Sequence, residues 1–341
     1  MASFRLTSTH FLPTIIVFVA TFTVPLSVQA QKLYGDYEAP RTAFGQPDIG
    51  GFWTNVTITP LTRPRALGDQ LVYSAEEASV IEARVEVEEA EANQATDPNA
   101  PADFQHERTV ALRPEFAAAG GATGFYNRFW LDPGSHLMRV GGEPRTSILT
   151  TENGQIPPRI NGAVPTRRRY PGGSFDSYEA RGFGERCIIG FGRNGGPPMF
   201  ANGFYNNNYQ IVQSADHVLI LVEMIHDARI IRLNSKHRED NVRPWFGDSI
   251  GWWEGNTLVV ETTHIPESQA YYGAWETLTV TERFTRVAED RLHYRFVIED
   301  PATWSEAWGG EYEFSPMDGQ IYEYACHEGN YALPGILKGG Q

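Results

Sequence analysis

The chain contains little cysteine, which limits both its cross-links and its metal motifs. Only two cysteines occur in 341 residues, Cys187 and Cys326. No Cys-x-x-Cys or His-x-His pair is present, so no local metal-binding motif stands out. In an oxidising compartment the simplest prediction is one disulfide between the two cysteines, closing a long loop. The alternative is that one of them is a catalytic thiol, since a nucleophile needs no second cysteine.

Basic residues are scarce relative to acidic ones. The sequence has 28 lysines and arginines against 42 aspartates and glutamates, for a net charge of −14 at pH 7. An acidic surface repels nucleic acid and anionic membranes. We therefore expect neither of them as a partner.

Long hydrophobic runs are also rare, and the one that stands out lies in the first 30 residues. Arg5 precedes an apolar stretch from Phe11 to Val24, and Val28-Gln29-Ala30 forms a small-x-small cleavage site. This pattern predicts a signal peptide over residues 1–30. As a membrane anchor, the alternative, the stretch is short, because a spanning helix needs about 20 apolar residues.

Cleavage of this segment would take the net charge from −14 to −15, because Arg5 is lost. We expect a secreted, periplasmic protein with no stable membrane insertion after cleavage.

Residues 31–108 are predicted to form an N-terminal extension with a first strand and one surface helix. Gly51-Phe52-Trp53 is typical of the first strand of lipocalin-like barrels. Ser74 is a good N-cap before Glu76 and Glu77, which predicts a helix from this point to about Ala95.

Residues 109–341 are predicted to form the main domain, and their second half reads as short strands without intervening helices. The expected strands are 218–233 (a buried strand or hairpin), 257–263, 277–286, 292–300 and 321–325. Such a series favours an antiparallel meander that closes into a barrel. The predicted fold class is therefore all-β, an antiparallel, lipocalin-like barrel with long loops and one N-terminal surface helix.

Short motifs along the chain resemble those of a large family of secreted bacterial proteins with no established activity. They are Gly50-Gly51-Phe52-Trp53, Arg145-Thr146-Ser147, Glu223 through Arg229, Gly247-Asp248-Ser249, Trp253-Glu254-Gly255, Glu282-Arg283-Phe284 and Glu323 through Asn330. The chain departs from the family pattern at Asn256, where aspartate is usual, and in having Ile250 after Asp248-Ser249. The resemblance implies a secreted location and no particular reaction.

Two clusters of ionisable residues on an apolar background are the candidate catalytic groups. One contains Glu223 and His226, and the other contains His327 and Glu328. A histidine beside carboxylates titrates near neutral pH and can relay protons. In this hypothesis His226 and Asp248 exchange protons, and Glu223 orients His226 or acts as a second acid. His327 and Glu328 close the site.

Four further residues are candidates for substrate binding. Arg229 and Arg145 could hold an anionic or enolate oxygen through their guanidinium groups. Trp253 and Tyr209 offer aromatic surface for a sugar or a flat apolar molecule. The alternative is structural: an ion pair between Glu223 and Arg229 caps one end of the barrel, and the aromatic residues belong to its core.

These observations favour a cofactor-independent enzyme that uses acid/base chemistry on a small molecule, as a lyase, isomerase or hydrolase. A binding module for a hydrophobic or glycan ligand is the alternative, and an envelope structural protein is a third. No cofactor is expected. No metal is expected either, because His226, His327 and Glu328 would form a site only if the fold brought them together. The sequence does not determine the oligomeric state.

Overall fold

The computed structural model describes residues 34, 37–92, 131–160, 175–190, 195–201 and 205–339. The signal peptide predicted at residues 1–30 lies outside them. Within the described part of the chain, no helix has both the length and the apolar character needed to cross a membrane.

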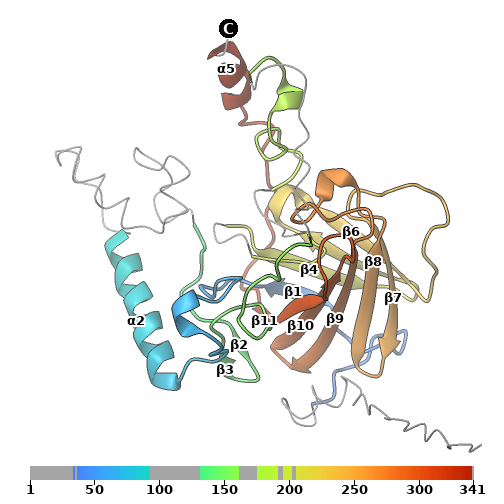
Figure 1. Ribbon diagram of the computed structural model, residues 1–341. Coiled ribbons are helices and arrows are strands. Elements are labelled where there is room, and N and C mark those ends of the chain that lie inside the picture. The colour runs from blue at the N-terminus through green and yellow to red at the C-terminus, as the bar shows by residue number, and fades with distance from the viewer. Residues whose placement is uncertain are drawn as a thin grey trace, which may run out of the picture.

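Nine strands of the described chain form a closed barrel (Figure 1). They are β1 (Gly51–Thr54), β4 (Asn208–Gln213), β5 (His217–Val222), β6 (Ala228–Leu233), β7 (Asp248–Glu254), β8 (Thr257–Thr263), β9 (Thr279–Ala288), β10 (Arg291–Glu299) and β11 (Trp308–Pro316). The short strand β1 pairs with β4 on one side and with β11 on the other. The strand expected in the extension over residues 31–108 therefore closes the barrel wall.

The barrel is mixed, so the prediction of an antiparallel barrel was wrong for one pair of strands. β6 and β7 run parallel, with Arg232 opposite Ile250 and Leu233 opposite Gly251. The connection over residues 234–247 causes this arrangement, because it returns the chain to the end of the barrel at which β6 began. All other neighbouring strands in the barrel are antiparallel.

The segment 218–233 is a hairpin, one of the two forms expected, and it does not continue as a single alternating strand. A 3₁₀ turn, η4 (Met224–His226), separates β5 from β6. Ile225 and His226 have positive φ angles of 59° and 46°. This left-handed backbone breaks the alternation of side-chain faces between β5 and β6.

The C-terminal region also differs from the prediction. Residues 321–325 are not a strand, and the last strand of the barrel is β11, at residues 308–316. A second helix, α5 (Ala332–Gly339), follows and lies beyond one end of the barrel (Figure 1).

The expected N-terminal helix is present as α2 (Ala75–Ala92), and it lies beside the barrel (Figure 1). Ser74 and Glu77 cap it reciprocally. The Glu77 amide donates to the Ser74 hydroxyl at 3.2 Å, and the Ser74 amide donates to the Glu77 carboxylate at 2.8 Å. This capping box satisfies two backbone donors that the first turn would otherwise leave unpaired.

The remaining elements among the described residues are short. They are η1 (Arg65–Leu67), the two-stranded sheet of β2 (Arg139–Val140) and β3 (Glu143–Pro144), η3 (Tyr178–Ala180) and η5 (Glu267–Gln269).

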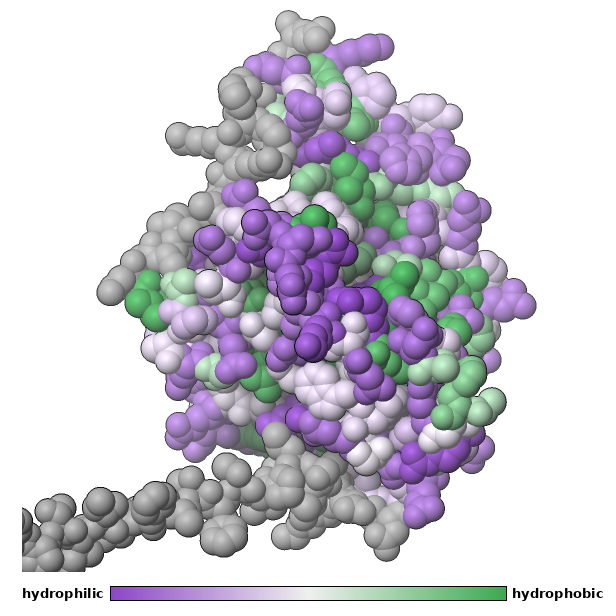
Figure 2. All heavy atoms as spheres, turned by 90° about the vertical axis from the view of Figure 1, so that its right-hand side faces the viewer, coloured by the Kyte–Doolittle hydropathy of each residue, from purple (hydrophilic) through white to green (hydrophobic). Residues whose placement is uncertain are grey.

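Apolar side chains fill the barrel interior. On β10 the alternating residues Leu292, Tyr294, Phe296 and Ile298 are all fully buried. Alternation is the natural period of a strand with one buried face, so the sequence pattern itself directs these side chains inward. Figure 2 shows the side of the barrel that lies to the right in Figure 1, where polar residues are interspersed with separate apolar patches.

Two glycines at the start of β11 allow another segment to approach the barrel wall. The Leu149 backbone bridges to Gly310, and the Thr150 amide donates to the Gly309 carbonyl. A Cβ atom on Gly310 would collide with the Ile148 carbonyl. The close approach places Ile148 at the mouth of the barrel, where it lines the pocket described below.

Candidate functional site

The structure does not bring the predicted catalytic residues together. His226 is exposed on the turn between β5 and β6, and His327 and Glu328 are exposed in the C-terminal segment. Asp248 is buried, but its carboxylate is bonded to Arg232 and other groups, and His226 is not among them. The structure therefore offers no geometry for proton exchange between His226 and Asp248.

Glu223 has a structural role at the barrel mouth. Its buried carboxylate accepts hydrogen bonds from the Asn208 side chain at 2.7 Å and from the Tyr322 amide at 2.9 Å. These bonds fasten the C-terminal segment to the start of β4. The possible ion pair with Arg229 is not formed.

Arg229 instead pairs with Glu282 inside the barrel. Its two terminal nitrogens lie 2.6 and 3.0 Å from the Glu282 carboxylate oxygens, a bidentate contact that joins β6 to β9 across the interior. Both side chains are almost completely buried. Because two desolvated charges are tolerated only when well paired, the contact explains how a guanidinium and a carboxylate sit among aromatic rings.

A chain of hydrogen bonds continues from this ion pair. The Tyr294 hydroxyl donates to Glu282 at 2.7 Å and accepts from the Met199 amide at 3.0 Å. The Tyr312 hydroxyl donates to the Met199 carbonyl at 2.9 Å. Burial, together with the charge of Glu282, raises the pKa of Tyr294 well above its ordinary value, so its hydroxyl remains a donor.

Asn55 ends this chain of bonds at the barrel mouth. Its side-chain nitrogen donates to the hydroxyls of Tyr209 at 3.1 Å and Tyr312 at 3.2 Å. Tyr209, predicted to bind substrate, is therefore a fully buried part of this internal network. The side-chain oxygen of Asn55 is buried and has no hydrogen-bond partner among the described residues.

A pocket of about 470 Å³ opens between α2 and the barrel mouth. Asn55, Tyr312, Met138 and Ile148 contribute buried side chains to it. The remaining lining residues are Thr57, Ile58, Thr59, Pro60, Leu61, Ile81, Arg84, Val85, Glu88, Phe200 and Ala201. The pocket walls are thus only slightly more apolar than polar, and one lining residue, Asn55, has an unpaired side-chain oxygen. Apolar surface with a few polar groups is the usual character of a small-molecule site.

The other predicted substrate-binding residues lie elsewhere. Arg145 is buried outside the barrel, where it bonds Glu311 at 2.8 Å and lies 3.6 Å from Glu143. Trp253 lies near the end of β7, next to the turn into β8, and packs against the core. Arg145, Arg229 and Trp253 thus serve three different parts of the structure.

Asp227 is a partly buried carboxyl group at the end of the β5–β6 turn. Burial raises its pKa from 3.8 to about 7. A carboxyl group that titrates near neutral pH can accept and return a proton under physiological conditions.

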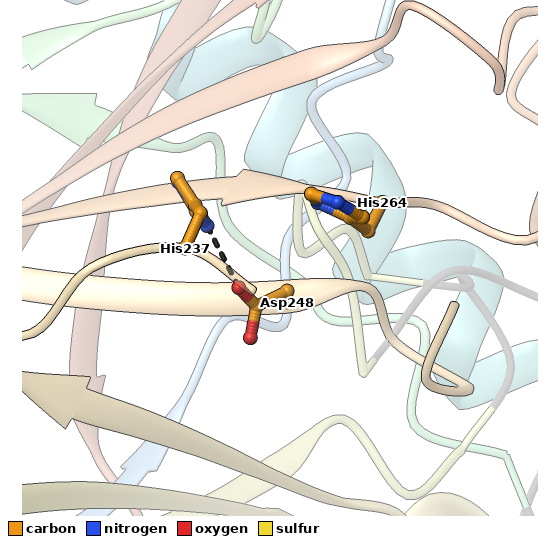
Figure 3. Close-up of side chains that lie close together, drawn as sticks. All are labelled: His237, Asp248 and His264. Carbon is orange, nitrogen blue, oxygen red and sulfur yellow. Dashed lines mark hydrogen bonds and ion pairs between the residues drawn. The ribbon is translucent and has the colours of Figure 1, made fainter. Parts of the chain in front are cut away.

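A second polar cluster lies on the outer face of the barrel wall (Figure 3). Ser249 bonds Thr262 in the buried layer at 2.8 Å, so its neighbour Asp248 faces the opposite side of β7. There Asp248 contacts His237, from the connection between β6 and β7, and lies near His264, the residue after β8.

Each side chain of this outer cluster has a defined partner. His237 Nδ1 lies 2.9 Å from Asp248, and its Nε2 lies 3.0 Å from Glu261. His264 Nδ1 lies 2.8 Å from the Thr263 hydroxyl. One possible ligand atom from each of His237, Asp248 and His264 lies within 4.8 Å of the others.

Asp248 is held as a carboxylate in this environment. Burial alone would raise its pKa, but hydrogen bonds from the Arg238 amide, His237 and Arg232 hold the pKa below its ordinary value. His237 and His264 do not stand out in the sequence as functional candidates, because their neighbours along the chain are polar. The one signal in the sequence is Asp248, itself a predicted catalytic residue, because a buried carboxylate needs a positively charged or hydrogen-bonding partner.

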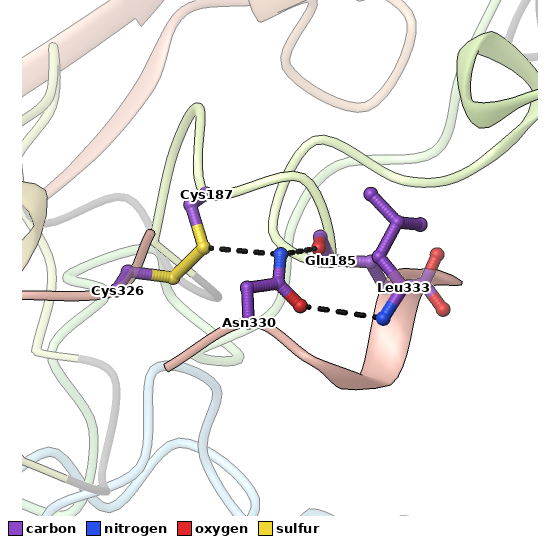
Figure 4. The surroundings of a disulfide bond; sticks show 5 residues. All are labelled: Glu185, Cys187, Cys326, Asn330 and Leu333. Atoms are coloured by element: carbon purple, nitrogen blue, oxygen red, sulfur yellow. Dashed lines mark hydrogen bonds between the residues drawn. A yellow bond between two sulfur atoms is a disulfide. The ribbon is translucent and has the colours of Figure 1, made fainter. Parts of the chain in front are cut away.

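The predicted disulfide between Cys187 and Cys326 is present (Figure 4). The Asn330 side chain donates to the Glu185 carbonyl at 2.8 Å and lies 3.4 Å from the Cys187 sulfur. The C-terminal segment is thus fastened to the loop around residue 187, and the catalytic-thiol alternative is excluded for this bonded state.

No family model matches the chain, and no curated protein matches it.

Proposed function

We propose that the protein is a secreted binding protein for a small, mainly apolar molecule, which it holds at the mouth of the barrel. The proposal keeps the lipocalin-like character that the sequence predicts, with the ligand site at one end of the barrel. The observation that supports it is the 470 Å³ pocket, whose lining includes Asn55 with its unpaired side-chain oxygen. The disulfide is consistent with a location outside the cytoplasm.

The pocket chemistry defines the kind of ligand. Its volume falls within the range of about 300–1,000 Å³ that is usual for small-molecule sites. The apolar side chains of the walls favour an aromatic or aliphatic body. Asn55 lines the pocket, but its Oδ1 has almost no exposed area, so a ligand hydroxyl or N–H group can donate to it only when the lining shifts slightly. Arg84 and Glu88 of α2 are exposed at the pocket edge and carry opposite charges. Together they favour neither an anionic nor a cationic ligand.

A pair of matched probes tests this proposal. We expect 2-naphthol to bind more tightly than naphthalene, because only the phenol can donate to Asn55. One hydrogen bond contributes about 0.5–1.5 kcal/mol, or roughly a 2- to 10-fold change in affinity. The Asn55→Ala variant should lose this preference, while Asn256→Ala, which changes an amide on the β7–β8 turn, should keep it.

Because Asn55 also bonds two tyrosines, a second variant separates binding from folding. Ile58→Trp fills the pocket from its half-buried wall and should abolish binding of both probes while the thermal transition persists. Equal probe binding by wild type and Ile58→Trp would contradict the proposal. Native mass spectrometry of protein from its own host would then identify the natural ligand.

The second candidate is the cofactor-independent acid/base enzyme, a lyase, isomerase or hydrolase. The observation that favours it is Asp227, whose carboxyl group titrates near neutral pH beside the barrel mouth. An enzyme converts the molecule that copurifies with it, whereas a binding protein returns it unchanged. Incubation of the identified ligand with wild type and Asp227→Asn, followed by mass analysis, distinguishes the two.

A further inference from the structure

The outer cluster of His237, Asp248 and His264 has a donor set that the proposed ligand pocket does not use. Two imidazoles and one carboxylate meet within 4.8 Å of one another. Imidazole nitrogen suits zinc, iron, nickel and copper, whereas magnesium and calcium prefer oxygen ligands. We propose that these three residues bind a divalent first-row transition-metal ion, for which Zn²⁺ is the representative.

The hydrogen bonds around His237 support this assignment. Its Nε2 lies 3.0 Å from the Glu261 carboxylate, which can accept the ring proton and leave Nδ1 unprotonated. Nδ1 is the atom that faces Asp248 at 2.9 Å. A histidine that ligates a metal through one nitrogen and donates to a carboxylate through the other is the usual arrangement in metal sites.

His264 and Asp248 are oriented in a similar way. The Thr263 hydroxyl pairs with His264 Nδ1 at 2.8 Å, so the other ring nitrogen can act as a ligand. Arg232 and the Arg238 amide hold the Asp248 carboxylate at 2.7 and 2.9 Å. All three side chains are therefore positioned by outer partners before any ion arrives, which lowers the entropy cost of binding.

One ligand pair already has the spacing that a bound ion needs, and the three ligand atoms, which lie within 4.8 Å of one another, draw closer together on binding. Zinc lies about 2.0–2.2 Å from nitrogen and oxygen ligands, so neighbouring ligands around one ion stand on the order of 3–3.5 Å apart. His237 Nδ1 and Asp248 are already at 2.9 Å. Three protein ligands leave at least one coordination position of the ion open. Because the two histidines are only half-buried, water can reach that position.

Titration with Zn²⁺ tests the assignment in protein that carries no histidine tag and has been treated with a chelator. We expect one Zn²⁺ per chain and a rise in the thermal midpoint. His237→Gln and His264→Gln should each lower the affinity by at least 10-fold, and Glu261→Gln by about 10- to 100-fold. Mg²⁺ at the same concentration should not compete.

The chain contains a matched control in His217, which pairs with Asp216 at 2.9 Å and is not part of the His237 group. His217→Gln should leave the affinity for Zn²⁺ unchanged. Co²⁺ should give visible absorption bands in wild type that disappear in His264→Gln, a readout that does not depend on stability. The proposal is overturned if the His237→Gln/His264→Gln double variant, folded by circular dichroism, binds Zn²⁺ as tightly as wild type.

Discussion

At the scale of single residues, Asp227 makes the stability of the folded protein depend on pH. The carboxyl group lies in the β5–β6 turn, where burial favours its uncharged form. In the unfolded chain the same group loses its proton near pH 4. Between about pH 4 and pH 7 the folded protein therefore holds a proton that the unfolded chain has released.

This difference predicts how stability changes with pH. Because the folded state binds more protons in that window, the contribution of Asp227 to stability is present below about pH 4 and is lost as the pH rises through about 7. The difference in thermal midpoint between Asp227→Asn and wild type should thus grow in favour of the variant from pH 4 to pH 8.

Thermal unfolding followed by circular dichroism at several pH values measures this difference. The exposed Asp318→Asn variant serves as the control for removing a surface carboxylate. A difference between Asp227→Asn and wild type that stays constant across the range would contradict the assignment.

At the scale of elements, the segment after β11 is joined to the rest of the protein at a few points. The barrel wall is complete at Pro316, and most residues of 317–339 are exposed. The disulfide, the Asn330 side chain and the bond from the Tyr322 amide to Glu223 fasten the segment. Without the disulfide the segment can detach while the barrel remains folded.

Reduction should therefore release this segment selectively. The disulfide spans 139 residues, and loop-closure entropy of that length corresponds to an upper value of about 5 kcal/mol for unfolding of the whole chain. We expect Cys326→Ser to be cleaved by protease between residues 317 and 331 at least 10-fold faster than the oxidised wild type, with the barrel fragment left intact.

Mass spectrometry of the cleavage products locates the cut, and Asn330→Ala, which keeps the disulfide, should show only a small acceleration. Equal cleavage rates for Cys326→Ser and wild type would show that other contacts hold the segment.

The elements also show why some predictions succeeded. The strand predicted at 257–263 matches β8, and the capping residues Ser74 and Glu77 correctly marked the start of α2. These features depend on neighbours within a few residues. The position of the hairpin turn at Ile225 and His226 was not predicted, since a β-branched residue such as Ile225 rarely adopts the left-handed backbone that the surrounding structure imposes there.

At the scale of the whole molecule, the Arg229–Glu282 pair connects strands on different sides of the barrel. Each partner is stabilised by the other, and Tyr294 adds a third hydrogen bond. Removing one partner leaves an uncompensated charge in an apolar interior, whereas removing both can be nearly neutral.

We predict that Arg229→Met lowers the free energy of unfolding by roughly 3–5 kcal/mol. Arg229→Met/Glu282→Leu should recover most of this loss, because no buried charge remains. Urea-induced unfolding of the four proteins in this cycle provides the comparison. A double variant as unstable as the sum of its single variants would show that the two side chains act independently.

The sequence by itself determined the local and compositional features of this protein. Alternating residues such as Leu292, Tyr294 and Phe296 specify a strand with one buried face, and the two cysteines allow only one intramolecular disulfide. The buried face of a strand follows from the chemistry of neighbouring residues, and the single disulfide follows from the number of cysteines.

Only the tertiary structure decided which distant residues meet. Strand closure by β1, the parallel pairing of β6 with β7 and the partner of Arg229 all depend on how the barrel closes. His237 meets Asp248 because residues 234–247 cross back over the wall, and no local pattern records that path. The physical reason is that a charged side chain selects its partner by proximity in the folded state, which sequence spacing does not specify.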